Sequence, residues 1–411
     1  MDVSVSSERR FYRTPDGAIW TEGECYYEIL ARYLEVFDRV NMVARVVDVD
    51  APRPNQRRAD GDGVRFSPLP NYLGPWQYLS RQRAVKRAIR AAIGPRDAVI
   101  LSVPSHIATC IEQELPPGRP YALQVLSDPD SAFAPEAMRH PLRPVLRPLF
   151  TRNLQRQAQN ACSSLYVTRQ ALQARYPCPQ FMAGISDVDL IPEAFVDQPR
   201  TFPQDREGAT LISVAGMSQV QKGQDVLIDA AAACIEGGVD LRIVLVGDGK
   251  HRPEYEARAS RLGIRDRIAF RGQLPPGETI RAELDAADLF VFPSRSEGLP
   301  RAVVEAMARA MPCLASSVNG IPELLASEDL LPPGDVAALS QAIRQVVGDP
   351  ARLQRMSARN LQKAREYSAD LLQRQRTDFY RVVFERTAAM LAKAPLVDRG
   401  AGSQKQMSGV S

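Results

Sequence analysis

The chain has 411 residues, of which 45% are hydrophobic and 24% are charged, and its formal net charge is +4. This length corresponds to two or three ordinary domains, and the composition is that of a soluble globular protein. No apolar run approaches the ~18 residues of a membrane-spanning helix, and the N-terminus lacks the basic and apolar regions of a secretory signal. We therefore expect a cytoplasmic protein with two buried cores.

Cysteine and histidine are both sparse. The six cysteines form no CxxC pair, so we expect reduced thiols that are mostly buried. The three histidines, His106, His140 and His251, lie far apart, whereas a histidine-based metal site usually gathers its ligands in spaced clusters. The sequence therefore predicts no bound metal ion.

Basic residues concentrate in the N-terminal half. Residues 51–175 contain 18 Lys or Arg and 8 Asp or Glu, a net charge of +10. Only six of the 52 basic residues are lysines, so a lysine at a motif position carries more weight here than in a lysine-rich protein.

The N-terminal half alternates strand-like and helix-like segments. Short apolar runs predict strands at 2–6, 40–47, 98–103 and 121–126. Helical spacing of apolar residues predicts a helix over 26–37 and a basic helix over 81–93. Prolines and a charged cluster interrupt the pattern at 192–208, where we place the domain boundary.

The C-terminal half repeats one pattern more cleanly. Near-continuous apolar strands separated by helices are typical of a parallel sheet covered on both faces. A last helix is predicted over 369–393. The strands are predicted at 210–215, 241–246, 268–270, 289–292 and 313–315, with helices between them, the first over 225–235.

These elements predict an α/β protein with two Rossmann-like domains. We expect an N-terminal domain over 1–198, a C-terminal domain over 199–376, a terminal helix over 377–393 and a disordered tail over 394–411.

The strongest motif runs from Ser294 to Ala306, between a predicted strand and a predicted helix. Pro300 suits the first helical turn, and Gly298 lets the backbone approach a ligand closely. The unpaired amides at 299–302 and the positive end of the helix would bind an anion such as a diphosphate.

Two carboxylates belong to this motif. Glu297 precedes the helix and Glu305 lies inside its second turn, so both could face one ligand and accept hydrogen bonds from sugar hydroxyls. The alternative is an ordinary helix start with one solvated and one capping glutamate.

A second loop, from Gly216 to Gly223, also follows a predicted strand. Ligands bind at the carboxyl ends of the strands in a doubly wound sheet. Lys222 could meet a phosphate there as a point charge, although a lysine in a surface turn is more often only solvated.

Together these segments resemble the retaining family 4 glycosyltransferases of the GT-B fold. The resemblance covers residues 209–376 well and the N-terminal half loosely. It implies two Rossmann-like domains that face each other across a cleft, with the last helix crossing back to the N-terminal domain. The matching segments are 216–223, 246–249, 270–272, 288–294, the E-x7-E spacing of Glu297 and Glu305, Pro312, and 319–323.

The resemblance also implies roles for single residues. Lys222 would hold the donor diphosphate, and Glu297 would bind hydroxyls of the donor sugar; we assign both to catalysis as well. Glu305 would bind the ribose hydroxyls, and the backbone of Gln273 and Leu274 would meet the nucleotide base. The other donor-binding positions are Gly216, Gly298, Leu299, Pro300, Arg301 and Ala302.

Two features of the N-terminal half have counterparts in the family. Members often carry a glycine-rich loop after the first strand, and 17–23 could be this loop, with Gly23 near the acceptor or a phosphate. Members also often place a histidine near the donor sugar at the end of a central strand. His106 is our candidate for that catalytic position, with a packed or solvated histidine as the alternative.

One residue departs from the family pattern. Many members have an arginine just after the glycine of the first C-terminal loop, and this chain has Met217 there. The diphosphate would then depend more on Lys222 or on a basic residue elsewhere. Asp128-Pro129-Asp130 is more typical of a turn than of a catalytic base.

Two basic stretches, 81–96 and 139–156, interleave arginines with apolar residues. Such stretches favour an anionic membrane surface, with about 1 kcal/mol gained per basic group near it. A solvated arginine face is the alternative. Prolines at 141, 144 and 148 argue against one continuous helix over the second stretch. Nucleic-acid binding fits poorly, because no array of stacking aromatics accompanies the charge.

The resemblance therefore implies a retaining, metal-independent hexosyltransferase without a further cofactor. Its donor would be UDP-glucose or another UDP-hexose. Its acceptor would be a glycan or lipid-linked oligosaccharide of exopolysaccharide, capsule or lipopolysaccharide synthesis, met on the inner face of the membrane. An epimerase of the same fold and a non-catalytic UDP-sugar-binding protein are the alternatives. A dehydrogenase is disfavoured, because 247–252 lacks the third glycine of GxGxxG.

Overall fold

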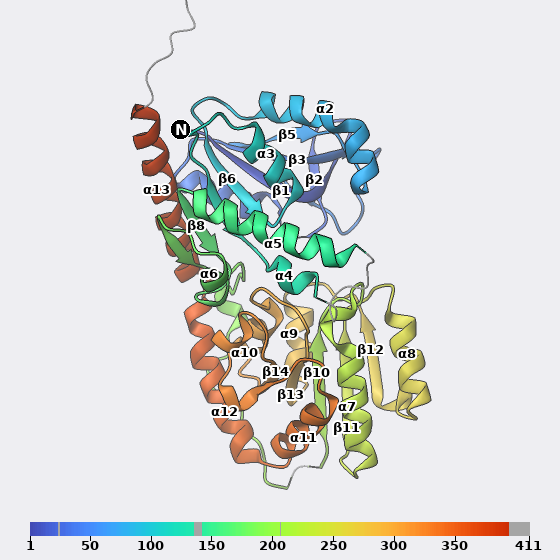
Figure 1. Ribbon diagram of the computed structural model, residues 1–411. Helices are drawn as coiled ribbons and strands as arrows, with labels where there is room; N and C mark the ends of the chain where they lie inside the picture. The colour runs from blue at the N-terminus through green and yellow to red at the C-terminus, as the bar shows by residue number, and fades with distance from the viewer. Residues whose placement is uncertain (24, 135–141, 206, 394–411) are drawn as a thin grey trace, which may run out of the picture.

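The computed structural model describes residues 1–23, 25–134, 142–205 and 207–393. Two α/β domains lie one above the other in Figure 1. The predicted fold class, two Rossmann-like domains, is therefore confirmed. His140 and the predicted tail over 394–411 lie outside the described residues.

The N-terminal domain is built on a parallel sheet. Its strands are apolar and buried on both faces near the middle of the sheet, as the sequence predicts for β3 and β6. In spatial order the strands are β5 (Val64–Leu69), β3 (Val40–Asp48), β1 (Val3–Arg13), β6 (Ala98–Val103), β7 (Ala122–Val125), β8 (Ser163–Tyr166) and β9 (Met182–Gly184).

The first strand is longer than the predicted segment 2–6. A register shift between Ser7 and Arg10 lets β1 change neighbours, from β6 before the shift to β2 (Ile19–Thr21) after it. The pairing with β2 is antiparallel, and β2 pairs in turn with β4 (Arg57–Arg58).

This hairpin corrects the expectation of a glycine-rich loop over 17–23. Gly17 lies in the turn between β1 and β2, where its amide donates to the carbonyl of Thr14. Only Gly23 lies in the connection that leads on to α1 (Tyr27–Leu30) and to the 3-10 helix η1 (Ala31–Glu35).

Three helices cover one face of this sheet: α2 (Gly74–Ala92), α3 (His106–Glu114) and α5 (Arg143–Asn160) (Figure 1). The middle helix, α3, contacts both neighbours. Cys110 Sγ lies 3.3 Å from the Tyr78 hydroxyl of α2, and Glu112 pairs with Arg156 of α5 at 2.6 Å. Each of the three follows a parallel strand, so their N-terminal ends lie at the carboxyl edge of the sheet.

Helices cover most of the described part of both basic stretches, α2 over 81–92 and α5 over 143–156. The predicted helix over 81–93 begins earlier, at Gly74. The prediction that prolines prevent one helix over 139–156 is wrong for 143–156, because α5 is continuous with Pro148 inside it. Pro144 lies in the first turn, where a missing N–H costs no hydrogen bond.

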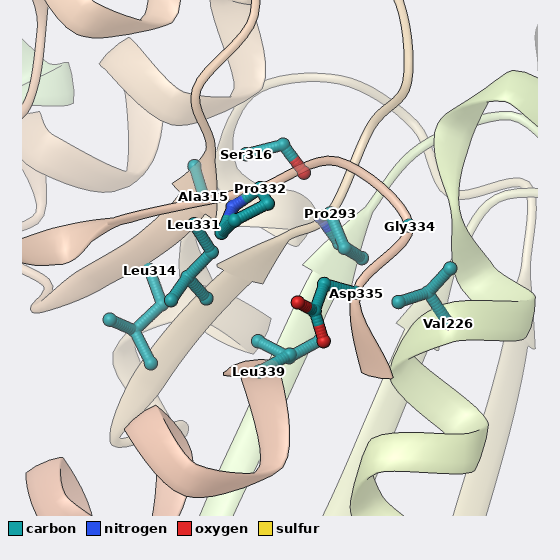
Figure 2. Close-up of a pocket in the computed structure, with 10 residues that line it drawn as sticks. All are labelled: Val226, Pro293, Leu314, Ala315, Ser316, Leu331, Pro332, Gly334, Asp335 and Leu339. Atoms are coloured by element: carbon teal, nitrogen blue, oxygen red, sulfur yellow. The ribbon is translucent and has the colours of Figure 1, made fainter. Parts of the chain in front are cut away.

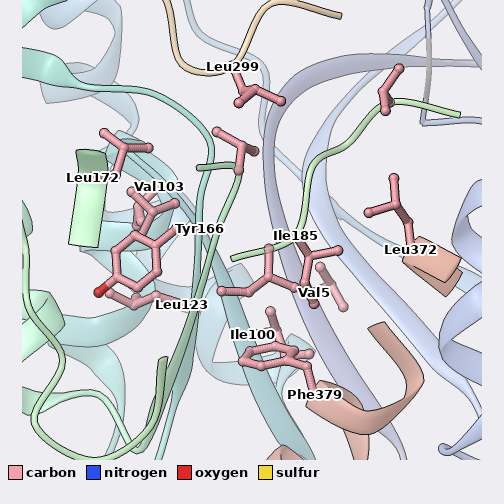
Figure 3. Close-up of a cluster of buried hydrophobic side chains, with 14 of the residues drawn as sticks. Val5, Ile100, Val103, Leu123, Tyr166, Leu172, Ile185, Leu299, Leu372 and Phe379 are labelled. Carbon is pink, nitrogen blue, oxygen red and sulfur yellow. The ribbon is translucent and has the colours of Figure 1, made fainter. Parts of the chain in front are cut away.

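The last helix, α13 (Ala369–Lys393), belongs to the N-terminal core. Figure 3 shows Phe379 against Val5 and Ile100 of the sheet. Tyr380 stacks on Tyr33, with ring centroids 4.5 Å apart. The chain therefore crosses back to its first domain through a helix with the predicted bounds, 369–393, which begins before the domain limit that we placed at residue 377.

The C-terminal domain has a six-stranded parallel sheet, and its predicted strands agree with those observed to within two residues. In spatial order they are β12 (Ile268–Gly272), β11 (Leu241–Val246), β10 (Ala209–Val214), β13 (Leu289–Phe292), β14 (Cys313–Ser316) and β15 (Leu330–Leu331). The helices are α7 (Gln224–Glu236), α8 (Arg252–Arg261), α9 (Glu278–Asp285), α10 (Arg301–Ala308), α11 (Val336–Val347) and α12 (Pro350–Ala364).

Two short helices complete the N-terminal domain: α4 (Pro129–Ala132), after β7, and α6 (Ala171–Arg175), after β8. All six cysteines are free thiols, as expected. Among the described residues, no helix combines the length and apolar character needed to cross a bilayer.

Candidate active site

The loops that follow β10 and β13 are bonded to each other at the carboxyl edge of the C-terminal sheet. The Gln221 carbonyl accepts from the Arg295 amide (2.7 Å), and the Ser294 hydroxyl oxygen lies 3.0 Å from the same carbonyl. Arg295 also reaches Asp225 with both guanidinium nitrogens, at 2.9 and 2.7 Å. The two predicted donor loops therefore form one unit.

Gly223 permits this close approach. Its φ is +75°, and a Cβ here would lie 2.0 Å from the Pro293 carbonyl oxygen. Any other residue would meet both a conformational and a steric obstacle. Because Lys222 is the preceding residue, the contact fixes the point from which its side chain starts.

The two residues predicted for catalysis in this domain lie side by side. Lys222 Nζ is 2.7 Å from Glu297 Oε1, and the Ser294 hydroxyl donates to the same oxygen at 2.6 Å. The Glu297 side chain is 8% exposed and that of Lys222 is 26% exposed. A cation and a hydrogen-bond acceptor thus meet at the surface of the unit, which suits a phosphate bonded to a sugar.

The helix after Glu297 begins one residue later than predicted. Pro300 is the residue before α10 rather than its first residue. Arg301 and Ala302 are the first two residues of this helix, so their backbone amides lie in its first turn. The Leu299 side chain is buried between the domains (Figure 3), which leaves only its backbone for a ligand.

The same loop touches the N-terminal domain at Gly298. A Cβ on Gly298 would lie 2.7 Å from the carbonyl oxygen of Leu126, at the end of β7. The Gly320 amide donates to the Gly298 carbonyl at 3.0 Å. The carboxyl edges of the two sheets therefore face each other, with the Glu297 loop between them.

Glu305 lies one turn along α10 from Arg301, and both are partly exposed. Burial raises the pKa of the Glu305 carboxyl, and the charge of Arg301 opposes that rise. The charge of Asp187, in the segment after β9, adds to the rise. Glu305 therefore lies at the boundary between the domains.

Arg9 of β1 brings a positive charge to this boundary. A Cβ at Gly23 would lie 2.9 Å from Arg9 Nη1, so the predicted loop glycine leaves room for the guanidinium. The charge of Arg9 contributes to a lower pKa of Arg301, which burial chiefly causes, and it opposes the rise that burial gives the pKa of Asp187. This arginine is a basic group that the sequence did not single out.

The remaining predicted donor positions lie at the same edge. Gly216 follows β10, and Gln273 and Leu274 follow β12, with Gln273 exposed. Met217 is fully buried, and its amide donates to the Asp248 carbonyl at 2.8 Å. The side chain that replaces the family arginine is therefore part of the core.

His106 begins α3, directly after β6, as predicted. Its Nδ1 lies 3.1 Å from the Tyr72 hydroxyl, and its ring meets the Tyr78 ring edge-on, with centroids 4.2 Å apart. Burial lowers the pKa of His106. Among the interactions of the described residues, none joins His106 to Lys222 or Glu297, so the structure gives it a packed aromatic setting within the N-terminal domain.

Sequence reasoning missed the groups that orient Glu297. Ser294 could have been found, because it lies three residues before the glutamate whose carboxylate it bonds. Asn319 donates its side-chain amide to the Glu297 carbonyl and also bonds Ser131, 188 residues away. The sequence carries no signal for that pairing.

Figure 2 shows a hollow behind these loops, where Val226 and Pro293 face Leu314, Leu331 and Leu339. It has no room for a water molecule, so it is a packing seam that supports Pro293. A second cavity of about 380 Å³ lies beside the linker, lined by residues 190–197 and 365–370. Within the described ranges, no group of three or more His, Cys, Asp or Glu side chains is arranged to hold a metal.

Comparison with known proteins places this site in a family. The Glycosyl transferases group 1 family matches residues 208–349. Protein CapJ of Staphylococcus aureus is 26% identical over 78% of this chain and 80% of its own length. The 2-deoxystreptamine glucosyltransferase of Streptomyces kanamyceticus is 32% identical over 44% of this chain and half of its own.

Solved structures share the whole architecture. Sucrose-phosphate synthase from Thermosynechococcus elongatus superposes with a TM-score of 0.68 at 18% identity, over 94% of this chain and all of the other. Anabaena HepE in complex with UDP and glucose superposes with a TM-score of 0.62 at 17% identity, over 92% and 99%. Residues 208–349 of this chain thus match the group 1 glycosyl transferases, and the chain has the GT-B fold.

Proposed function

We propose that this protein is a retaining hexosyltransferase that uses a UDP-hexose, most simply UDP-glucose. The observation that carries the proposal is the pairing of Lys222 with Glu297 on two interlocked loops, with Glu305 on the helix that follows. A cation for the diphosphate and carboxylates for sugar and ribose hydroxyls then lie on one edge of the sheet, opposite the N-terminal domain.

The donor would bind along this edge. Lys222 and the first amides of α10 would hold the diphosphate, since both present positive charge to it. Glu297 would accept from hydroxyls of the sugar and Glu305 from those of the ribose. The base would lie against the backbone of Gln273 and Leu274.

Transfer would proceed on the face from which the diphosphate leaves. The acceptor oxygen bonds to the anomeric carbon as the bond from that carbon to the diphosphate oxygen breaks, and the hydroxyl proton passes to the departing diphosphate. Lys222 and the helix end stabilise the charge that develops there, the term that usually dominates such catalysis. These groups would take the place of a metal ion.

Two relatives support the choice of donor. HepE is described in complex with UDP and glucose, and the Streptomyces relative is named a glucosyltransferase. The sequence match to that relative covers 44% of the chain, and HepE shares only the fold at 17% identity, so the nucleotide and the sugar are proposals for this protein.

We propose a glycan or lipid-linked oligosaccharide as the acceptor, presented at an anionic membrane surface. Large apolar side chains are exposed near the N-terminal ends of the two helices that flank α3: Trp76 (82%) and Leu79 (57%) on α2, and Val145 (66%) and Leu149 (59%) on α5. Exposed arginines follow on both helices: Arg83, Arg87 and Arg152.

The charge of these helices is smaller than the sequence suggests, because several basic residues are paired internally. Arg147 bonds Asp130, Arg156 bonds Glu112, and Lys86 and Arg90 bond Glu114. The apolar residues therefore have to supply part of any membrane affinity.

A ligand screen followed by product analysis tests the proposal. Thermal unfolding is measured with UDP, GDP, ADP, UDP-glucose, UDP-N-acetylglucosamine and GDP-mannose, because a ligand of the native state raises the midpoint. A shift selective for UDP compounds is expected, and no shift with any compound contradicts the proposal. Sugar interconversion without acceptor would favour the epimerase, and binding without hydrolysis or transfer would favour the non-catalytic alternative.

A further inference from the structure

A chain of hydrogen bonds runs from the N-terminal domain to the backbone of Glu297. The Asn319 amide donates to the Ser131 hydroxyl oxygen at 2.9 Å and to the Glu297 carbonyl. The Ser131 hydroxyl in turn donates to the Asp128 carboxylate at 2.6 Å. Ser131 and Asp128 belong to the N-terminal domain, so the chain crosses the domain boundary.

The hydrogen-bonded groups on the N-terminal-domain side are firmly held. Asp128 is 1% exposed and caps α4 by accepting from the Asp130 amide at 3.0 Å. The Tyr176 hydroxyl and the Arg175 guanidinium also donate to its carboxylate. Asp130 pairs with both nitrogens of Arg147, at 2.8 and 2.9 Å, which ties α4 to α5. Ser131 is therefore a fixed point rather than a mobile hydroxyl.

The hydrogen-bonded groups on the C-terminal-domain side are equally constrained. Asn319 has φ +44°, a left-handed conformation that asparagine tolerates and most residues avoid. In that conformation its side chain reaches both Ser131 and the Glu297 carbonyl. The next residue, Gly320, bonds Gly298, and a Cβ on Gly320 would lie 2.6 Å from the Gly298 carbonyl oxygen. The turn at 319–320 therefore clamps the backbone that carries the Glu297 carboxylate.

We infer that Asn319 is a positioning residue that sets the sugar-binding carboxylate of Glu297 according to the approach of the N-terminal domain. When Ser131 is in place, both amide hydrogens of Asn319 are used and the Glu297 carbonyl is held. When the domains separate, Asn319 loses one partner, and the loop that carries Glu297 is less constrained. Binding of the donor sugar is thereby coupled to closure of the N-terminal domain on the C-terminal domain. This inference rests on the proposed function of Glu297.

Two substitutions break the chain at different points without disturbing the backbone. Asn319→Gly removes the side chain and keeps the positive φ, which glycine adopts readily. Ser131→Ala removes the interdomain bond and leaves the bond from Asn319 to Glu297. Ser317→Ala, at an exposed position two residues before Asn319, is the matched control.

The measurement is the dissociation constant of UDP-glucose and of UDP by calorimetry, together with kcat and the donor KM. Asn319→Gly is expected to weaken UDP-glucose about fivefold, the effect of losing one ordinary hydrogen bond, and to leave UDP within about twofold. Ser131→Ala is expected to have a smaller effect of the same kind. The double variant is expected to match Asn319→Gly alone, since residues of one network are not additive.

Three outcomes would overturn the inference. UDP-glucose affinity and turnover unchanged in Asn319→Gly would remove the positioning role. Equal losses for UDP and UDP-glucose, with a lowered unfolding midpoint, would make Asn319 merely structural. Additive effects of the two substitutions would mean that Ser131 does not act through Asn319. If the wild-type protein binds none of UDP, UDP-glucose, GDP and GDP-mannose, the proposed function itself fails.

Discussion

The ammonium of Lys222 and the carboxylate of Glu297 form an ion pair across two loops that lie 75 residues apart in the sequence. The pair is shielded from water on the Glu297 side, and Ser294 shares the same carboxylate oxygen. A donor diphosphate that takes Lys222 as its partner would release Glu297 oxygens for hydroxyls of the sugar. The two halves of a nucleotide sugar would thus be recognised in one exchange of partners.

Replacing Lys222 by alanine should impair transfer far more than binding of the nucleoside. We expect kcat to fall about 10²- to 10³-fold, the usual effect of removing one group that stabilises charge in the transition state. Steady-state kinetics with a fixed acceptor measures this. Lys363→Ala on α12, where the lysine pairs with Glu366, is the control. Turnover of Lys222→Ala equal to that of the wild-type protein would refute the assignment.

Gly223→Ala tests the contact between the two donor loops. The added Cβ would meet the Pro293 carbonyl at 2.0 Å, so the loops must separate and carry Lys222 away from Glu297. We expect nucleotide sugar affinity to fall at least about tenfold and the unfolding midpoint to drop, because φ is +75° there. Gly238→Ala has a similar φ and no atom within 4 Å, which isolates the conformational cost. Equal behaviour of the two variants would contradict the steric argument.

Glu305 links stability to pH in a direction that can be tested. Burial raises its pKa above the ordinary 4.5, so the ionised form destabilises the fold at neutral pH, and the penalty disappears as the pH falls below the raised pKa. Glu305→Gln should therefore raise the unfolding midpoint at pH 7.5, with the gain shrinking toward about pH 4. The same variant should bind UDP more weakly. A gain independent of pH would argue against ionisation as the cause.

His106 should behave in the opposite sense. Burial lowers its pKa below 6.5, so the neutral ring contributes stability above that pH, and the contribution is lost as the pH falls through 6.5 toward the folded-state value. In thermal unfolding scans, the midpoint of His106→Gln should rise relative to that of the wild-type protein as the pH falls below 6.5. The proposed catalytic role of His106 further predicts that His106→Gln lowers kcat and leaves UDP affinity unchanged. His251→Gln, which removes a histidine bonded to Glu254, is the control.

Membrane docking is expected to need the exposed apolar residues of α2 and α5. In a vesicle sedimentation assay, Trp76→Ser with Leu149→Ser should reduce binding to anionic vesicles about tenfold or more, from the lost apolar burial. Added salt should weaken binding of the wild-type protein to anionic vesicles, since the arginines contribute by charge. Leu262→Ser, at an exposed leucine of the C-terminal domain, serves as the control. Equal binding to neutral and anionic vesicles would refute the docking surface.

The C-terminal domain was predictable because its strands are short, apolar and buried on both faces. Leu289–Phe292 and Leu241–Val246 need no partner to be recognised, and both were predicted with their observed bounds. The donor motif was readable for the same reason, since Lys222 and Glu297 each lie in the loop that follows such a strand. What places them 2.7 Å apart is the pairing of backbone groups at Gln221 and Arg295.

The N-terminal half was less legible because its strands are polar or short. β8 reads Ser-Ser-Leu-Tyr and β5 contains a proline, so neither gives an apolar run. β1 continues past the charged residues at 8–10 into a segment, 11–13, that pairs with both β2 and β3. The prolines of α5 led to the wrong prediction of an interrupted helix. Pro144 occupies the first turn, where the missing N–H loses no hydrogen bond.

The stacking of Tyr380 on Tyr33 sets an order on how the protein is made. Phe379, Tyr380 and Val383 complete the core of the domain that begins at the N-terminus, although the whole C-terminal domain is translated in between. Domains synthesised first generally fold first, but here the first cannot close its core until α13 has left the ribosome. The N-terminal domain is translated first but completes its core last. A truncation near residue 375 should therefore destabilise the N-terminal domain rather than the C-terminal domain beside the cut.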